Sequence, residues 1–143
     1  MRAAKARLQS ILKPIRARAS SNEIVCLVDD DPSIRKSVGR LLEAAGFKVN
    51  AFSEAQPFLG YLANNNVPVA VLDIWMERMT GLELLVELNA KSPATRVIFI
   101  TGQEDPGAEK TVMKSGAFGF LTKPFDPDVF VDMVTRAFRS VKS

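Results

Sequence analysis

The chain has 143 residues, of which 47% are hydrophobic and 24% are charged, values that are typical of one ordinary globular domain. It contains no histidine and a single cysteine, Cys26, which excludes histidine-based metal sites, Ser-His or Cys-His nucleophile pairs and an internal disulfide framework. The formal net charge of +3 suggests a basic protein that binds nucleic acid, but this charge is unevenly distributed along the chain.

Residues 1–22 carry the basic character. They contain six Lys or Arg residues and no acidic residue, which leaves 13 basic and 16 acidic residues from Glu23 onward. Apolar residues in this segment have the spacing of one helix face: Leu8, Ile11, Leu12 and Ile15. We expect a flexible or partly helical N-terminal extension, 1–22, followed by one domain at 23–143. Such a segment could contact an anionic membrane, a partner or nucleic acid, and its composition also fits a transit peptide. We do not expect direct binding of nucleic acid or a membrane except through this extension.

From residue 24 onward, short apolar runs alternate with helical segments. The runs predict buried strands at 24–28, 47–52, 69–72, 97–100 and 118–121. Helices are expected to begin at Pro32, just after Ser53, and at Gly81, Pro106 and Pro127. Five strands alternating with five helices predict an α/β domain with a mostly parallel sheet covered on both faces. No apolar run approaches the roughly eighteen residues of a membrane span, so we expect no membrane-spanning helix.

The ends of the expected helices carry recognisable signals. Aspartate before proline predicts an N-cap at Asp31, Asp105 and Asp126. Ser53 with Gln56 predicts a capping box. Glycines predict the C-terminal stops at Gly46 and Gly116, and Phe125 and Phe130 predict a hydrophobic staple across a cap. In the segment after Gly81, helical spacing of apolar residues is seen at Leu82, Leu85 and Val86.

Polar residues follow the strands. They are Asp29, Asp30 and Asp31 after the first strand, Asp73 after the third, Thr101 after the fourth and Lys123 after the fifth. Strand ends of a parallel sheet meet at the edge where ligands bind, so these side chains are expected to converge. Each residue alone has a simpler explanation as a helix cap, a turn residue or a solvated charge, and for Asp31 capping is the preferred one.

The residue types at this edge indicate phosphoryl chemistry. Clustered carboxylates repel one another and are stable when a cation compensates them; oxygen ligands favour Mg²⁺, with Mn²⁺ or Ca²⁺ as substitutes. A carboxylate can be the covalent nucleophile toward phosphorus, while a lysine and a hydroxyl suit the remaining phosphoryl oxygens. The chain has no glycine-rich phosphate loop, so ordinary nucleotide binding is not supported.

Four segments resemble the receiver domain of bacterial two-component response regulators. They are VDDDPSIR at 28–35, VLDIWMERMTG at 71–81, VIFITG at 97–102 and FGFLTKPF at 118–125. The resemblance covers about residues 23–142 and implies the doubly wound, flavodoxin-like (βα)5 fold. It also implies that Asp73 is the phosphoacceptor. Mg²⁺ would be bound directly by Asp30, mainly through water by Asp29, and also by Asp73 and the backbone carbonyl of Trp75.

The same resemblance assigns contacts with the phosphoryl group to Thr101 and Lys123, and a cis peptide to Lys123–Pro124. Thr101 and Phe120 would form the family's switch, which reshapes a face made by the helix after residue 105, the strand 118–121 and the last helix. That face would serve a homodimer or another partner. Core packing alone would also explain Phe120.

The expected function is therefore acceptance of a phosphoryl group from a sensor histidine kinase or a histidine phosphotransfer protein, in the cytoplasm. Self-phosphorylation and autodephosphorylation would be its only chemistry, so we do not expect an enzyme. The chain would be a stand-alone receiver or part of a larger regulator such as a transcription factor. An aspartate-nucleophile phosphatase is an alternative, but its second aspartate would stand where this chain has Trp75. A degenerate receiver that only binds a partner is a third class, although every residue needed for the chemistry is present.

The loop after Asp73 departs from the family pattern. Glu77 stands where the family usually has proline, which predicts a less rigid and more negative loop. Trp75 is large for its position and could shield an acyl phosphate from water. Arg78, in the same loop, could instead recruit the phosphate of the donor.

Overall fold

A computed structural model describes residues 23–102 and 104–141; the expected extension at 1–22 lies outside them. The strands are β1 (Ile24–Val28), β2 (Lys48–Phe52), β3 (Val69–Asp73), β4 (Arg96–Thr101) and β5 (Gly119–Thr122). The helices are α2 (Pro32–Ala44), α3 (Ala55–Asn64), α4 (Gly81–Lys91), α5 (Pro106–Lys114) and α6 (Pro127–Val141).

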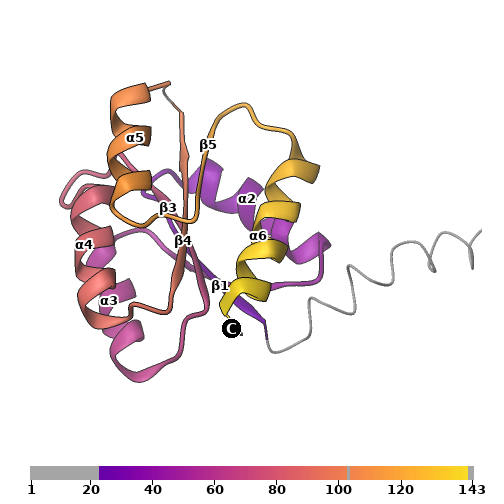
Figure 1. Cartoon of the computed structure of the whole chain (residues 1–143). Helices are drawn as coiled ribbons and strands as arrows, with labels where there is room; N and C mark the ends of the chain where they lie inside the picture. Colours follow the sequence, from indigo (N-terminus) through magenta and orange to yellow (C-terminus); the bar gives the residue numbers. More distant parts are fainter. Residues whose placement is uncertain (1–22, 103, 142–143) are drawn as a thin grey trace, which may run out of the picture.

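All strand pairs are parallel, in the order β2-β1-β3-β4-β5. Helices α3, α4 and α5 cover one face of the sheet, and α2 and α6 cover the other (Figure 1). This is the doubly wound receiver fold that the sequence predicted. Within the described residues, no helix is long and apolar enough to cross a membrane.

Two apolar clusters hold the helices against the sheet. Because successive side chains of a strand point to opposite faces, Cys26 and Val28 of β1 pack with α3, α4 and α5, whereas Val25 and Leu27 pack with α2 and α6. All four are completely buried. The β1 run is therefore continuously apolar because both of its faces are covered.

The aspartate caps are confirmed. Oδ1 of Asp31 accepts from the amide of Ser33 at 2.9 Å, and Oδ1 of Asp105 accepts from the amide of Ala108 at 3.0 Å. Oδ1 of Asp126 likewise accepts from Asp128 N at 2.8 Å. Each bond satisfies a backbone amide in the first turn of a helix, because the amides of that turn have no acceptor within the helix.

The predicted glycine stops and hydrophobic staple are also present. Gly46 and Gly116 have φ values of 100° and 103°, a left-handed conformation in which a side chain would be strained. The amide of Phe47, just after Gly46, reaches back to the carbonyl of Leu42 at 3.1 Å, which completes a Schellman motif. The rings of Phe125 and Phe130 lie 5.1 Å apart between centroids.

Two local predictions were wrong. Helix α3 begins after Glu54, which makes no side-chain cap bond, so Ser53 and Gln56 form no capping box. Had Ser53 been the cap, Pro57 would stand at the fourth helical position, where an amide must bond to the cap carbonyl; one residue later, it stands in the first turn, where proline is tolerated. The capping box lies at Thr80 and Glu83 instead, where each side chain bonds to the other's backbone.

The apolar face of α4 is also shifted from the prediction. Leu84, Leu85 and Leu88 are the buried leucines, whereas the side chain of Val86 is 58% exposed. The residues that face the sheet follow Gly81, and not Leu82, at intervals of three and four. This is because Gly81 lies in close contact with β3 and β4.

Candidate functional site

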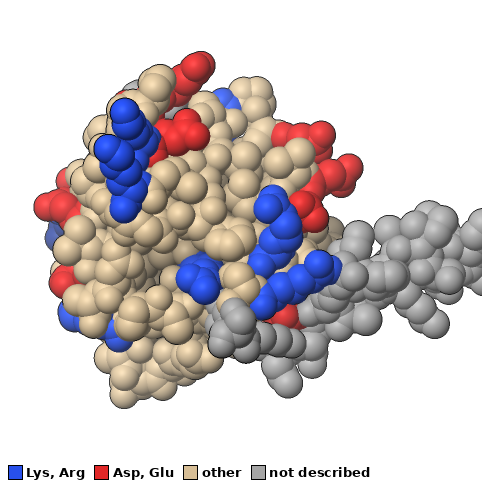
Figure 2. Space-filling model, viewed as in Figure 1, with Lys and Arg blue, Asp and Glu red and all other residues tan. Residues whose placement is uncertain are grey.

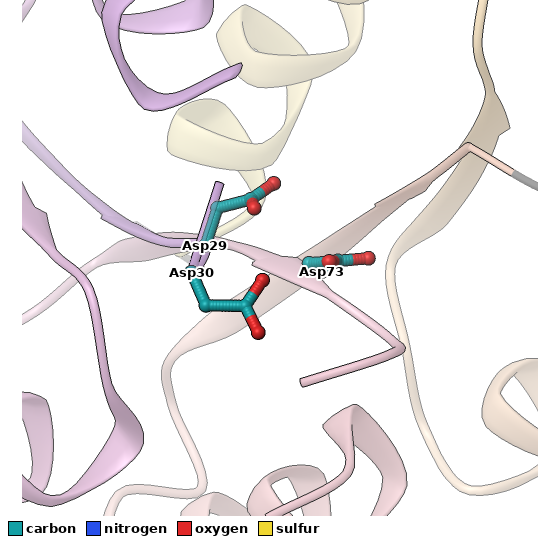
Figure 3. Close-up of side chains that lie close together, drawn as sticks. All are labelled: Asp29, Asp30 and Asp73. Atoms are coloured by element: carbon teal, nitrogen blue, oxygen red, sulfur yellow. The ribbon is translucent and has the colours of Figure 1, made fainter. Parts of the chain in front are cut away.

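Three carboxylates meet where β1 and β3 end. The two strands are neighbours, with Val28 beside Leu72, so Asp29 and Asp73 occupy adjacent strand ends. One carboxylate oxygen from each of Asp29, Asp30 and Asp73 lies within 4.8 Å of the others (Figure 3). The structure therefore brings together three of the four acidic residues that the sequence places at this edge, whereas the side chain of Asp31 caps α2 instead.

Asp29 is the most deeply placed of the three. It has no solvent exposure, and its Oδ1 accepts the amide of Asp31 at 2.9 Å. Among the described residues, its Oδ2 has no hydrogen-bond partner, and the Nζ of Lys123 lies 3.7 Å away. Burial raises the pKa of Asp29, although the Asp31 amide and Lys123 oppose that rise. A buried, incompletely satisfied carboxylate beside two others fits a cation ligand.

Asp73 ends β3 and is 9% exposed. Burial, followed by the negative charge of Asp29, raises its pKa to about 6. The backbone amide of Trp75 donates to Oδ1 of Asp73 at 3.3 Å, which partly offsets the rise. Asp73 is thus a carboxylate with limited solvent contact and a raised proton affinity, held in place by the loop that follows it.

Thr101 and Lys123 reach the same edge from β4 and β5. Asp73 pairs in register with Ile100, which places Thr101 one residue beyond it on the adjacent strand. The amide of Lys123 donates to the carbonyl of Thr101 at 2.8 Å, and the Lys123–Pro124 peptide is cis, as expected. Thr101 is completely buried and the Lys123 side chain is 20% exposed.

The expected switch residues share one face of the sheet. Phe120 of β5 pairs with Phe99 of β4, and Thr101 points to the same side as Phe99 because it is two residues further along the strand. Phe120 is partly buried against the cluster under α3, α4 and α5. Core packing accounts for this position, and the switch role stays a prediction.

The loop from Ile74 to Thr80 adjoins the acidic edge, since the amide of Trp75 donates to Asp73. Trp75 is 47% exposed, and Arg78 forms an ion pair with Glu54, with 3.6 Å between Nε and Oε1. Gly81 closes the loop by donating its amide to the Ile74 carbonyl at 2.7 Å. A Cβ on Gly81 would lie 2.9 Å from the carbonyl oxygen of Asp73, so only glycine fits there without a shift.

Sequence reasoning missed two supporting residues. Nη1 of Arg35 donates to the backbone carbonyl of Asp29 at 2.7 Å and so anchors the start of the acidic segment. In the sequence, Gly81 indicates only the start of a helix. Both residues belong to segments that carry the resemblance, VDDDPSIR and VLDIWMERMTG, and this was the available signal.

The chain is similar to many receiver domains. The response regulator receiver domain family matches residues 25–135. Transcriptional regulatory protein FixJ from Bradyrhizobium diazoefficiens is 35% identical over 118 residues, which cover 82% of this chain and 58% of FixJ. The DNA-binding transcriptional regulator NtrC from Salmonella typhimurium is 40% identical over 114 residues, 80% of this chain but 24% of NtrC. The chain thus spans little more than half of FixJ and about a quarter of NtrC.

Solved structures agree with this assignment. A response regulator receiver domain protein from Clostridium thermocellum superposes with a TM-score of 0.79 at 27% identity, covering 84% of this chain and 97% of that one. The beryllofluoride-activated NtrC4 receiver domain, which is a dimer, gives 0.78 at 30% identity, with 82% and 98% covered. The chain belongs to the response regulator receiver family, the signalling phosphoacceptor domains that pair with histidine kinases in two-component systems.

Proposed function

We propose that Asp73 accepts a phosphoryl group, in a Mg²⁺-dependent reaction, from the phosphohistidine of a sensor histidine kinase or a histidine phosphotransfer protein. The carboxylates of Asp29, Asp30 and Asp73 within 4.8 Å of one another carry this proposal. The 143 residues contain no histidine, so none of them can carry the phosphohistidine of the donor. We assign the receiver domain to residues 23–143.

The residues present fit a hard divalent cation. Asp29, Asp30 and Asp73, with the backbone carbonyl of Trp75, would hold Mg²⁺, and Mn²⁺ is a chemically suitable substitute. The buried Oδ2 of Asp29, which lacks a hydrogen bond among the described residues, supports this assignment. These residues would gain from the cation a positive charge that offsets the negative charge of the carboxylates and of a phosphoryl group.

The side chains then have separate roles. A carboxylate oxygen of Asp73 bonds to phosphorus while the bond between phosphorus and the donor's imidazole nitrogen breaks, and the nitrogen keeps that electron pair. The Lys123 ammonium and the Thr101 hydroxyl stabilise the transferred oxygens by charge and hydrogen bonding. Water later cleaves the acyl phosphate and regenerates Asp73. A general phosphatase is less well supported, since Trp75 stands where such an enzyme needs its second aspartate.

The output surface would be the face formed by α5, β5 and α6. Figure 2 shows this face with few charges over its centre and with both basic and acidic side chains around α5 and around α6. Thr101 and Phe120 lie on the strands beside α5, so a shift of the hydroxyl toward a phosphoryl group would open space for the ring. We propose that this face then binds a second copy or another partner. Similarity to FixJ and NtrC supports a role as the receiver part of a transcription regulator.

Incubation with acetyl phosphate and Mg²⁺, followed by intact mass, tests the proposal. We expect one phosphate per chain, none when Mg²⁺ is chelated, and none in Asp73→Ala. Asp132→Ala, which alters an exposed aspartate of α6, is the matched control and should be modified like the wild type. An unmodified wild type, or an adduct that survives in Asp73→Ala, would contradict the assignment.

A further inference from the structure

A pocket opens beside the acidic triad. Its volume is about 310 Å³, and it is lined by Asp30, residues 53–56 before and at the start of α3, and residues 76–79 of the loop after β3. This volume lies at the lower end of the range of about 300–1,000 Å³ for small-molecule sites, so the pocket has room for a small organic phosphate. Asp30 belongs to both the triad and the pocket, so a molecule in the pocket would lie next to the site of phosphoryl transfer.

The charges around the pocket are mostly negative, although a donor that reaches Asp73 through it would itself be an anion. Asp30, Glu54 and Glu77 all line it, and among the described lining residues Arg78 is the one cation. A cation bound to the triad would compensate Asp30, but the two glutamates would still repel a dianionic donor. Arg78 is therefore the residue on which admission of an anion to this pocket depends.

The contact between Arg78 and Glu54 is weak enough to exchange. Their side chains are 85% and 51% exposed, and an exposed pair of this kind contributes little to stability. The contact with Glu54 is made by Nε of Arg78, whereas a guanidinium carries five N–H donors and can bind a phosphate or carboxylate through two of them. Glu54 thus competes with an incoming anion for Arg78.

We infer that Arg78 is a donor-binding residue that recruits small acyl phosphates into this pocket, and that Glu54 restrains it. This inference rests on the proposed function of Asp73. In the step itself, the bond between phosphorus and the acyl oxygen breaks, an Asp73 oxygen bonds to phosphorus, and the carboxylate leaves with the electron pair. Arg78 acts on the approach and orientation of the donor, and it takes no part in bond making.

The test measures the apparent second-order rate constant for phosphorylation by acetyl phosphate at saturating Mg²⁺, using intact mass. Loss of a charge-assisted contact in Arg78→Gln should lower this constant about fivefold. Neither the affinity for Mg²⁺ nor the melting temperature should change in this variant. The Mg²⁺ affinity can be read from the fluorescence of Trp75, the one tryptophan of the chain. Lys91→Gln is the control, because Lys91 forms a comparable exposed pair with Glu87 at 3.5 Å on α4.

A double-mutant cycle separates restraint from simple repulsion. Glu54→Gln should raise the rate constant because it removes a negative charge and releases Arg78; Glu77→Gln only removes a charge. The gain from Glu54→Gln should therefore shrink in the Arg78→Gln background, whereas the gain from Glu77→Gln should persist. Strictly additive effects of Glu54→Gln and Arg78→Gln would overturn the restraint.

The outcomes also distinguish this inference from the proposed function. If the wild type is phosphorylated and Arg78→Gln reacts at the same rate, the recruiting role is wrong and the phosphoacceptor role stands. If Arg78→Gln loses rate and Mg²⁺ affinity together, Arg78 acts through the structure of the loop, which also overturns the inference. If the wild type takes up no phosphate, the proposed function itself fails.

Discussion

The ammonium of Lys123 lies 3.7 Å from Oδ2 of Asp29, an oxygen that is shielded from solvent and has no hydrogen-bond partner among the described residues. The pair joins the ends of β1 and β5, which are separated by two strands in the sheet. Because Asp30 and Asp73 lie close by, Lys123 offsets the repulsion of a whole carboxylate cluster. It therefore influences both the stability of the unliganded domain and the charge that a phosphoryl group would meet.

Lys123→Met should destabilise the metal-free domain by about 2 kcal/mol, since it leaves buried carboxylates without their nearby positive charge. Urea unfolding in the presence of a chelator measures this effect. In an Asp29→Asn background the same substitution should cost clearly less, because the charge it compensates is gone. An equal cost in both backgrounds would show that Lys123 does not act through Asp29.

The stability of the metal-free domain should rise as the pH falls from 7 toward 4.5. Asp73 has a pKa of about 6 in the folded chain against an ordinary value of 3.8, so between these values the folded state binds more protons than the unfolded state. The ionised Asp73 thus costs about 3 kcal/mol at neutral pH, and protonation removes that cost as the pH falls. Asp29, whose pKa is also raised, acts in the same direction.

Chemical unfolding at several pH values, with Mg²⁺ chelated, checks this prediction. Asp73→Asn is the control: it should be more stable than the wild type at pH 7 and should show a smaller gain on acidification. If the stability of the wild type did not increase relative to that of Asp73→Asn as the pH falls, the raised pKa of Asp73 would be contradicted.

Gly81→Ala should destabilise the domain by about 2 kcal/mol or more, since its Cβ would lie 2.7 to 2.9 Å from Phe99, the backbone of Ile74 and the Asp73 carbonyl. The displaced loop should also slow phosphorylation of Asp73. Gly60→Ala is the matched control, because nothing lies within 4 Å of its Cβ position. It stands inside α3, where alanine should stabilise the helix by up to about 1 kcal/mol. Thermal unfolding of both variants tests the contrast.

Trp75→Asn should shorten the lifetime of the phosphorylated state. The indole is half exposed, and the amide of the same residue bonds to Asp73, so the ring is attached close to the phosphoacceptor and can restrict water. A fivefold faster release of phosphate would correspond to about 1 kcal/mol in the barrier. Val86→Asn is the control. It removes an exposed apolar side chain from α4 and should leave the rate of phosphate release unchanged. An unaltered rate in Trp75→Asn would refute the shielding role.

Most of the site was predictable because it depends on where strands end. Asp29 and Asp73 follow short, β-rich apolar runs that predict buried strands, and parallel strands place their carboxyl ends at one edge. The start of α3 was not predicted correctly from Ser53, because the position of Pro57 outweighs the capping pattern. Val86 was misplaced because the contact of Gly81 with β3 sets the rotation of α4, and that contact is not visible in the helix's own periodicity.

By itself, the sequence determined the α/β alternation, the five strands, most helix ends and the residue types at the acidic edge, since these follow from local propensity and apolar periodicity. Only the tertiary structure decided which partners those residues meet: Lys123 beside Asp29, Arg35 on the Asp29 carbonyl and Arg78 against Glu54. Such contacts join segments far apart along the chain or on different elements. They depend on strand order, helix rotation and loop path, which no local pattern encodes.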